Sequence, residues 1–205
     1  MENNNDIKIP LGKRAVKRSF DLLTASVATV VFAIPSAVIA LLVWLQDRHN
    51  PIFSQERVGR DGRRFTLYKF RSMRIDAEKD GTPQLCRDHD SRLTSVGRFI
   101  RGHHLDEFPQ LWNVLRGDMS VVGPRPERPF YVDKIKQEFP DYEYVFRVRP
   151  GLFSDATLHN GYTDTIDKMV RRAELDLDYT RNFNLATDIR IIWATTMSIL
   201  SGKKF

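Results

Sequence analysis

The chain has 205 residues, a length that suits one domain with a hydrophobic core and is short for two. Its 32 Lys and Arg residues outnumber its 26 Asp and Glu residues, and the net charge of +6 predicts an acidic partner: nucleic acid, phosphorylated small molecules or an anionic lipid surface. The single cysteine, Cys86, excludes an internal disulfide, fits a reducing compartment and is interpreted as an inert small side chain.

An uncharged apolar segment runs from Leu22 to Leu45. It is about 24 residues long, and a helix that spans the bilayer core needs roughly 20. The segment is too long for a cleaved signal peptide, and no small-residue cleavage site follows it. A helix in a soluble core is the alternative, but so long an uncharged run is rare outside membranes. We therefore interpret it as a membrane helix.

Basic residues flank this segment on both sides, and positive charge near a membrane segment marks the cytoplasmic face. Pro35 lies near the middle of the segment, where it removes a backbone hydrogen bond and kinks the helix, and Ser36 can help to satisfy the freed groups. We therefore predict a re-entrant helix with both ends in the cytoplasm; an ordinary kinked span is the alternative. The basic residues expected at the interface before it are Lys13, Arg14, Lys17 and Arg18.

Residues 52–70 predict two strands joined by a turn between Gly59 and Gly62. Basic residues dominate from Arg57 to Arg74, with Asp61 as the only acid. Such a run is usually a solvated face, but beside a membrane segment it also attracts anionic headgroups. Alternating basic and aromatic residues can also bind nucleic acid, so a non-enzymatic, membrane-anchored binding module remains an alternative. Residues 75–90 are polar and rich in turn formers, which predicts a surface loop.

Residues 91–105 predict a short helix that carries Arg98 and Arg101, and apolar residues at helical spacing from 105 to 115 predict a second one, ended by Gly117. Asp106 and Glu107 would then lie in a first turn, where the helix dipole favours carboxylates; that is their simplest structural role. A zinc site at His103 and His104 is not expected, because adjacent histidines do not share a helical face.

Arg125 stands between Pro124 and Pro126, which fix the backbone on either side of it. The arginine is either solvated on a rigid loop or held in a fixed geometry for a phosphate group. Further along, residues 167–183 predict a helix. The apolar ending, residues 188–205, fits either an amphipathic helix on the membrane surface or a core helix, and both remain open.

Three motifs follow the proline-broken segment in order: FSQERVGRDGRRFTLYKFRSM, LDEFPQLWNVLRGDMSVVGPRP and RVRPGL. Together they closely resemble the bacterial sugar transferase family, the monotopic phosphoglycosyl transferases, from about Lys13 to the C-terminus. The resemblance implies transfer of a sugar-1-phosphate from a nucleotide diphosphosugar to polyprenyl phosphate at the cytoplasmic face of the bacterial inner membrane. It further implies magnesium (Mg2+), a covalent phosphosugar intermediate on an aspartate, and release of a nucleoside monophosphate.

The resemblance also assigns roles to residues. The nucleophilic aspartate matches Asp106 and its partner matches Glu107, while the phosphate-binding residues match Lys69, Arg101 and the motif Pro124, Arg125 and Pro126. The chemistry fits independently. A carboxylate can attack phosphorus and form an acyl phosphate, two adjacent acids suit Mg2+, and the basic residues can hold phosphate oxygens. Glu107 could bind metal, act as a base or tune Asp106. Transfer without a covalent intermediate is the alternative mechanism.

The expected fold is α+β and mostly helical, with a re-entrant helix-break-helix, a small β-hairpin and amphipathic interfacial helices around a cytoplasmic active site. We expect a flexible N-terminus over residues 1–12, the re-entrant helix over 13–47 and the catalytic domain over 48–205. The expected partners are a nucleotide sugar, polyprenyl phosphate and membrane lipids, without nucleic acid, and a homodimer is left open. Residues 152–163 depart from the family pattern, which predicts an unusual sugar donor if they contact it.

Overall fold

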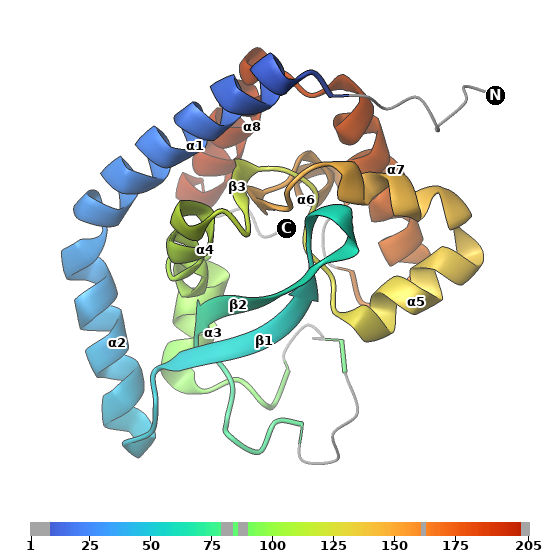
Figure 1. Cartoon of the computed structure of the whole chain (residues 1–205). Helices are drawn as coiled ribbons and strands as arrows, with labels where there is room; N and C mark the ends of the chain where they lie inside the picture. Colours follow the sequence, from blue (N-terminus) through green and yellow to red (C-terminus); the bar gives the residue numbers. More distant parts are fainter. Residues whose placement is uncertain (1–8, 79–83, 86–89, 161–162, 202–205) are drawn as a thin grey trace.

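The structure, a computed structural model, describes residues 9–78, 84–85, 90–160 and 163–201. Within these residues the chain is mostly helical and carries two small two-stranded sheets, so the predicted fold class is confirmed at this level (Figure 1). A bent pair of helices runs along one side of the molecule, and the rest of the described chain lies on one side of that pair (Figure 1). Helix α1 already begins at Leu11, inside the stretch 1–12 that we expected to be flexible; residues 1–8 and Cys86 lie outside the described residues.

Helices α1 (Leu11–Val31) and α2 (Ala33–Asp47) cover the predicted membrane segment and are bent by 61° at Phe32. The break therefore precedes Pro35, where the sequence placed the kink. A proline is tolerated in the first turn of a helix, because its missing N–H would have no partner there, and Pro35 occupies the first turn of α2. The backbone N–H of Ser36 donates to the carbonyl of Phe32 at 2.9 Å, which is the ordinary first hydrogen bond of α2 and gives Ser36 no special role at the break.

The bent pair exposes apolar surface. In α1 only Asp21 and Ala25 are buried, whereas Val30 is 77% exposed and Ile34, just past the break, is 79% exposed. Among the described residues no single helix is long and apolar enough to cross a bilayer, but α1 and α2 together meet that requirement as a bent pair. The arrangement fits a re-entrant loop and a broken span equally well.

The predicted hairpin is confirmed. Strand β1 (Ile52–Val58) pairs antiparallel with β2 (Arg64–Phe70), from Ile52 opposite Phe70 to Val58 opposite Arg64. The turn between them is the 3₁₀ helix η2 (Arg60–Gly62), in which Gly62 has a φ of 72°. Such a left-handed conformation is readily available to glycine, which explains why a glycine closes this turn.

The predicted helix over 105–115 is divided. After α3 (Ser95–Gly102), a 3₁₀ turn, η3 (Leu105–Glu107), precedes α4 (Gln110–Arg116). Pro109 has no N–H to donate to Leu105, so a continuous α-helical ladder cannot pass this point. Asp106 and Glu107 therefore occupy a separate turn before α4 rather than its first turn. Gly117 ends α4 with a φ of 96°, as predicted.

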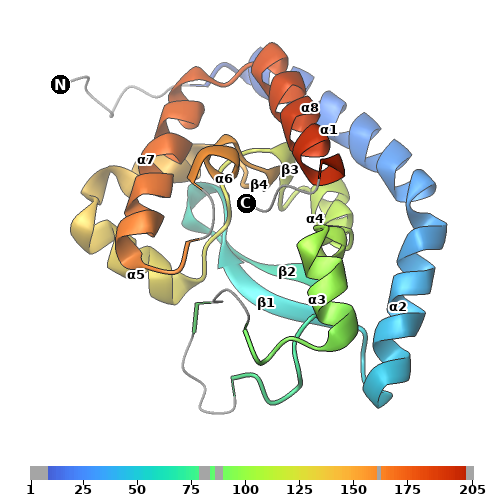
Figure 2. The same ribbon diagram turned by 180° about the vertical axis from the view of Figure 1, so that it is seen from behind.

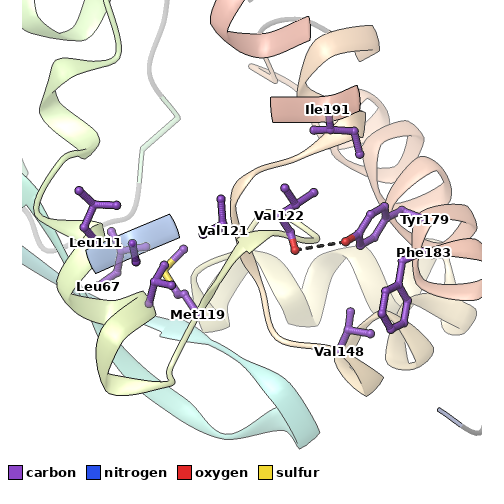
Figure 3. Packing of buried hydrophobic residues seen from close by; sticks show 11 residues of the cluster. Leu67, Leu111, Met119, Val121, Val122, Val148, Tyr179, Phe183 and Ile191 are labelled. Carbon is purple, nitrogen blue, oxygen red and sulfur yellow. Dashed lines mark hydrogen bonds between the residues drawn. The ribbon is translucent and has the colours of Figure 1, made fainter. Parts of the chain in front are cut away.

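A second sheet forms between segments far apart in the chain. Strand β3 (Ser120–Val122) pairs in parallel with β4 (Gly151–Phe153), with Ser120 opposite Gly151. A Cβ atom on Gly151 would lie 2.0 Å from the backbone N of Gly123, so this approach requires glycine. The residues of β3 are buried at the centre of the main core, together with side chains from β2, α4 and the C-terminal helices (Figure 3).

The C-terminal half is helical and closes the core. It comprises α5 (Pro129–Glu138), the 3₁₀ helix η4 (Pro140–Arg147), α6 (Asp155–Asn160), α7 (Ile166–Asn182) and α8 (Leu185–Leu200), so the helix predicted over 167–183 is confirmed. Helix α8 contributes Ile191 to the core, as the core alternative for the chain ending predicts, and it leaves Trp193 and Leu200 66% and 74% exposed, so placement on a membrane surface stays a prediction. Figure 2 shows α8 beside the start of α1.

Candidate active site

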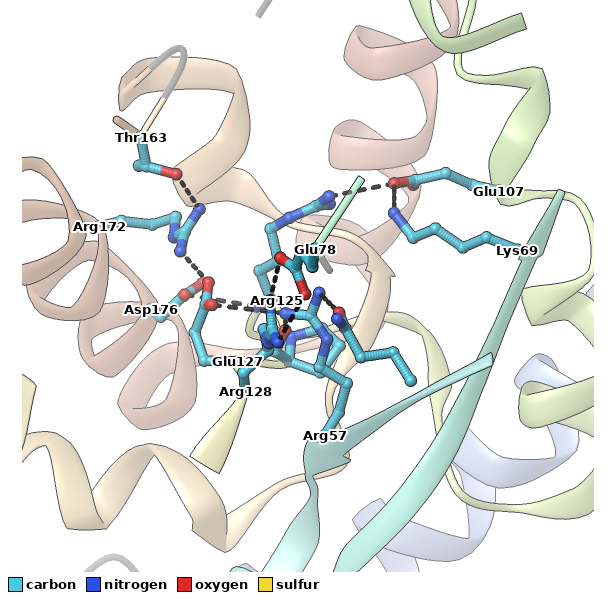
Figure 4. Close-up of polar contacts among 12 residues, drawn as sticks. Arg57, Lys69, Glu78, Glu107, Arg125, Glu127, Arg128, Thr163, Arg172 and Asp176 are labelled. Carbon is cyan, nitrogen blue, oxygen red and sulfur yellow. Dashed lines mark hydrogen bonds and ion pairs between the residues drawn. The ribbon is translucent and has the colours of Figure 1, made fainter. Parts of the chain in front are cut away.

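Two of the predicted basic site residues, Lys69 and Arg125, contact the carboxylate of a third predicted site residue, Glu107. Lys69 comes from β2, Glu107 from η3 and Arg125 from the loop after β3 (Figure 4). Lys69 Nζ lies 2.6 Å from Glu107 Oε1, and Arg125 Nη2 lies 3.1 Å from the same oxygen. Two cations thus share one anionic ligand, which holds them at a fixed separation.

Asp106 is 4% exposed, and its surroundings differ from those of Glu107. The carboxylate of Asp106 forms no hydrogen bond or ion pair with any of the residues that the structure describes. Burial raises the pKa of Asp106 above its ordinary value; the charge of Glu107 adds to this effect, and Lys69 opposes it. Burial also opposes ionisation of Glu107, but Lys69 and Arg125 hold the pKa of Glu107 well below its usual range. The two neighbours therefore have opposite properties, an arrangement typical of sites that use paired acids.

The remaining predicted basic residue, Arg101, lies in the last turn of α3. It is close enough to Asp106 to lower the pKa of that carboxyl, so it belongs to the same electropositive environment. Burial lowers the pKa of Lys69, whereas the attraction of Glu107 raises the pKa of Arg125. The site is therefore a partly desolvated cluster of cations around two carboxylates, where electrostatic attraction for phosphate oxygens is stronger than in water.

The loop around Arg125 is held rigidly. Pro124 and Pro126 are buried, and the side chain of Arg125 reaches Glu107 instead of extending into solvent. Its backbone N–H donates to Asp176 Oδ2 at 3.4 Å, and Ser154 Oγ donates to Asp176 Oδ1 at 3.0 Å. Burial raises the pKa of Asp176 to about 7. Of the two alternatives for Arg125, the structure favours an arginine in a fixed position.

The same loop is secured by ion pairs that the sequence did not reveal. Glu127 pairs with Arg172 of α7, and Arg57 Nη1 donates to the carbonyl of Pro126 at 3.0 Å (Figure 4). Arg172 also donates to Thr163 Oγ1 at 2.7 Å. The divergent stretch 152–163 is thereby joined to the loop of Arg125 through Arg172 and, at Ser154, through Asp176. Gly161 of that stretch lies outside the described residues.

Asn113 connects α4, which follows the Asp106–Glu107 turn, to β2, and it was also missed in the sequence. It is fully buried; its Nδ2 donates to the carbonyl of Thr66 at 2.7 Å, and its Oδ1 accepts from the N–H of Tyr68 at 3.1 Å. These bonds fix α4 against the strand that carries Lys69. An asparagine between the apolar positions Leu111 and Val114 of a predicted core-facing helix is the signal that could have identified it.

The residues present suit a magnesium ion only as part of a substrate complex. No group of three or more metal-binding side chains was found among the described residues, and His103 hydrogen-bonds instead to the carbonyl of Phe99 at 2.8 Å. Mg2+ is typically held by one or two carboxylates together with substrate phosphates and water. The carboxylate of Asp106, which has no hydrogen bond or ion pair within the described part of the chain, and that of Glu107, whose Oε1 contacts Lys69 and Arg125, could provide such a partial ligand set.

Of the four basic residues predicted at the membrane interface, Lys17 and Arg18 form ion pairs or hydrogen bonds within the protein, and Lys13 contacts an aromatic ring. Lys17 Nζ lies 2.7 Å from Asp188 Oδ2, and the guanidinium of Arg18 donates to the carbonyls of Val114 and Leu115 at 2.6 and 2.9 Å. Lys13 Nζ lies 4.2 Å from the centre of the Phe183 ring, and Arg14 is exposed.

Comparison with known proteins gives a consistent result. The family model described as bacterial sugar transferase matches residues 12–202. The chain is 41% identical over 187 residues to a UDP-N-acetylgalactosamine-undecaprenyl-phosphate N-acetylgalactosaminephosphotransferase of Aeromonas hydrophila, covering 91% of this chain and 44% of that protein. It is 38% identical over 184 residues to the UDP-glucose:undecaprenyl-phosphate glucose-1-phosphate transferase of Escherichia coli K12, covering 89% of this chain and 39% of that protein.

A transferase of the same description from Caulobacter vibrioides is 36% identical over 197 residues, covering 94% of this chain and 73% of that protein. The chain spans less than half the length of the Aeromonas and Escherichia relatives. The matched region includes every residue of the cluster described above.

Proposed function

The chain belongs to the bacterial sugar transferase family, and we propose that it transfers a sugar-1-phosphate from a UDP-sugar to undecaprenyl phosphate, releasing UMP. The observation that supports the proposal is that the adjacent carboxylates of Asp106 and Glu107 have different contacts. Glu107 forms ion pairs with Lys69 and Arg125, whereas the buried carboxylate of Asp106 beside them has no hydrogen bond or ion pair with any residue that the structure describes. The names of the relatives supply the substrate classes, and their different sugars leave the sugar of this enzyme open.

The transfer proceeds in two displacements at one phosphorus atom. First, a carboxylate oxygen of Asp106 attacks the phosphorus that bears the sugar; the bond from that phosphorus to the bridging oxygen breaks, and UMP leaves with that oxygen. Second, a phosphate oxygen of undecaprenyl phosphate attacks the same phosphorus. The bond to Asp106 breaks, the carboxylate is regenerated, and the lipid diphosphosugar is formed.

Lys69 and Arg125 stabilise the charge that shifts during both displacements. Fixed donors in a partly desolvated site stabilise developing phosphate charge without having to reorganise. Glu107 keeps the two donors in place before the substrate arrives, and Arg101 adds positive potential at Asp106. In this assignment Glu107 positions the cations and stays ionised because the pKa of its carboxyl is lowered.

We propose that Asp106 and Glu107, with the substrate diphosphate, also hold Mg2+. When bound, the ion would neutralise phosphate charge and so help an anionic carboxylate to approach. We further propose that α1 and α2 form a re-entrant anchor at the cytoplasmic face of the inner membrane. This places the catalytic residues where a water-soluble nucleotide sugar and a lipid phosphate meet. The reaction would be the first membrane step in the assembly of a polysaccharide, such as capsule, O-antigen or exopolysaccharide, or of another glycoconjugate.

The decisive experiment replaces the nucleophile. In Asp106→Asn and Asp106→Ala, UMP release from a UDP-sugar and undecaprenyl phosphate should fall by roughly 10³-fold or more, because loss of a covalent nucleophile removes the main pathway. Asp133→Asn, which alters an exposed acid on α5, is the matched control.

Trapping of the intermediate is the second measurement. Labelled phosphosugar should be trapped on the wild-type enzyme and not on Asp106→Ala. Near-normal turnover of Asp106→Ala would reject the mechanism, and turnover without trapped label would favour direct transfer.

A further inference from the structure

The first half of α1 docks against the catalytic part before the helix leaves it. Three polar side chains, Lys17, Arg18 and Asp21, lie on the docked turns, and Asp21 is only 1% exposed. Past Ala25 the helix has no further buried residue, and Val30 is 77% exposed. The docked turns thus belong to the proposed membrane anchor and also contact the part of the chain that carries the candidate active site.

Asp21 holds the start of β3. Its Oδ1 accepts a hydrogen bond from Ser120 Oγ at 2.8 Å and another from the N–H of Val121 at 3.0 Å. Ser120 is 1% exposed, so both bonds are shielded from water. Strand β3 leads directly into the loop of Arg125, so the carboxylate of Asp21 sets where that loop begins.

Arg18 holds the adjoining end of α4. Its two terminal nitrogens donate to the carbonyls of Val114 and Leu115 at 2.6 and 2.9 Å. The last carbonyls of a helix have no partner within the helix, and a cation there is favoured by the helix dipole. Helix α4 begins at Gln110, three residues after Glu107, so Arg18 holds the helix that follows the Asp106–Glu107 turn.

Lys17 extends the same connection to the far end of β3. Its ammonium pairs with the fully buried Asp188 of α8, and Asp188 Oδ1 accepts from the hydroxyl of Tyr179 at 2.7 Å. The oxygen of that hydroxyl also lies 3.2 Å from the carbonyl oxygen of Val122, the last residue of β3 (Figure 3). Helices α1 and α8 lie side by side in both views of the molecule (Figures 1 and 2). Strand β3 is therefore held at its start by α1 and at its end through α7 and α8.

We propose that Lys17, Arg18 and Asp21 are positioning residues that set the relative placement of Asp106 and Arg125. Arg18 contacts the end of α4, and Asp21 contacts the start of β3, on the two sides of the turn that joins these elements. Asp106 lies shortly before α4, and Arg125 lies shortly after β3. Burial of charged groups opposes folding unless they are well paired, so such a buried arrangement is a poor general source of stability but defines one geometry. The inference rests on the proposed function. It adds that the anchor helix forms part of the active-site framework and does more than tether the enzyme.

The test compares Asp21→Ala with Asp21→Asn. Asparagine retains the Oδ1 acceptor for Ser120 and Val121, whereas alanine removes it. We expect Asp21→Ala to lower kcat by roughly 10²-fold with little change in KM, because a small displacement of a catalytic group has effects of this size. Asp21→Asn should retain most of kcat. Thr29→Ala is the control on the same helix, because Thr29 Oγ1 donates only to the carbonyl of Ala25 at 2.7 Å.

A double-mutant cycle separates positioning from general stabilisation. If Asp21 acts through Arg125, adding Asp21→Ala to Arg125→Ala should produce no further loss in kcat, whereas independent effects multiply. Multiplying losses, or equal losses in Asp21→Asn and Asp21→Ala, would overturn the proposal.

Amide hydrogen exchange provides a readout that does not depend on activity. Residues 117–127 should exchange faster in Asp21→Ala than in the wild type, Asp21→Asn and Thr29→Ala, while membrane association stays the same. If the wild type releases no UMP from any UDP-sugar, the proposed function fails. The positioning role is then decided by exchange alone, and unchanged exchange over residues 117–127 would reject it.

Discussion

Asp106 and Glu107 are adjacent in sequence, yet the structure gives them different tasks. Lys69 and Arg125 neutralise Glu107, and burial raises the pKa of Asp106. A nucleophilic carboxylate must be ionised, so the charge of Glu107 acts against Asp106 at low pH. The benefit of Glu107 is geometric, because it holds together Lys69 and Arg125, the two cations that we propose bind phosphate.

This division of tasks predicts the behaviour of Glu107→Gln. Removal of the negative charge should lower the pKa of Asp106, because a like charge beside an acid raises its pKa. The acid limb of the kcat/KM profile, which reports ionisation of the free enzyme, should therefore move to lower pH. At its plateau kcat/KM should fall by roughly 10²-fold, because Lys69 and Arg125 lose their shared ligand.

The measurement is the pH profile of UMP release, with Glu138→Gln on the exposed face of α5 as the control. An acid limb that stays in place or moves to higher pH would contradict the assigned coupling between the two carboxyl groups.

At this scale the sequence identified residues that the structure brings together, but it missed the residues that hold them in place. Lys69, Glu107 and Arg125 were found from motifs, and the structure brings them together. Asn113 and Asp176 were missed, because the role of a buried polar residue depends on partners such as Tyr68 or the loop of Arg125 that are distant in the sequence. The local pattern could mark Asn113 as a polar residue at an apolar position, but it does not identify the partners of either residue.

Among the elements, those defined by local pattern were predicted well. The hairpin follows from alternating residues and a glycine-containing turn, and α7 follows from helical spacing. Strands β3 and β4 have only three residues each, too few to show a period, and they pair across about 30 residues of intervening chain. The break at Phe32 and the separate turn of Asp106 were displaced from their expected positions because proline acts on the residues before it.

The pairing of β3 and β4 predicts the effect of Gly151→Ala. The added Cβ would lie 2.0 Å from the backbone N of Gly123, so one strand must move and shift the start of the Arg125 loop. The free energy of unfolding should fall by about 1–3 kcal/mol, as for other overpacked sites. Turnover should fall further than the loss of folded protein explains.

Thermal unfolding and UMP release, measured on the same preparation, check this prediction. Gly12→Ala is the control, because its Cβ would meet no atom within 4 Å. Unchanged melting and turnover in Gly151→Ala would show that β4 can move away without consequence for the site.

The whole molecule combines a compact catalytic part with a bent, apolar helix pair along one side. We predict that both ends of this pair face the cytoplasm. In a Cys86→Ser background, single cysteines from Gly12→Cys and His49→Cys should both react with a membrane-impermeant thiol reagent only from the cytoplasmic side. Labelling of the two positions from opposite sides would establish a broken span and reject the re-entrant anchor.

One contact at the helix break bears on how the enzyme responds to its lipid surroundings. The ring of Phe32 stacks on that of Phe108, with centroids 4.5 Å apart, and Phe108 follows directly after Glu107. We predict that, in a bilayer, the depth of this break affects the position of the Asp106–Glu107 turn through the Phe32–Phe108 contact. UMP release should then depend on acyl-chain length, with an optimum in vesicles of graded thickness.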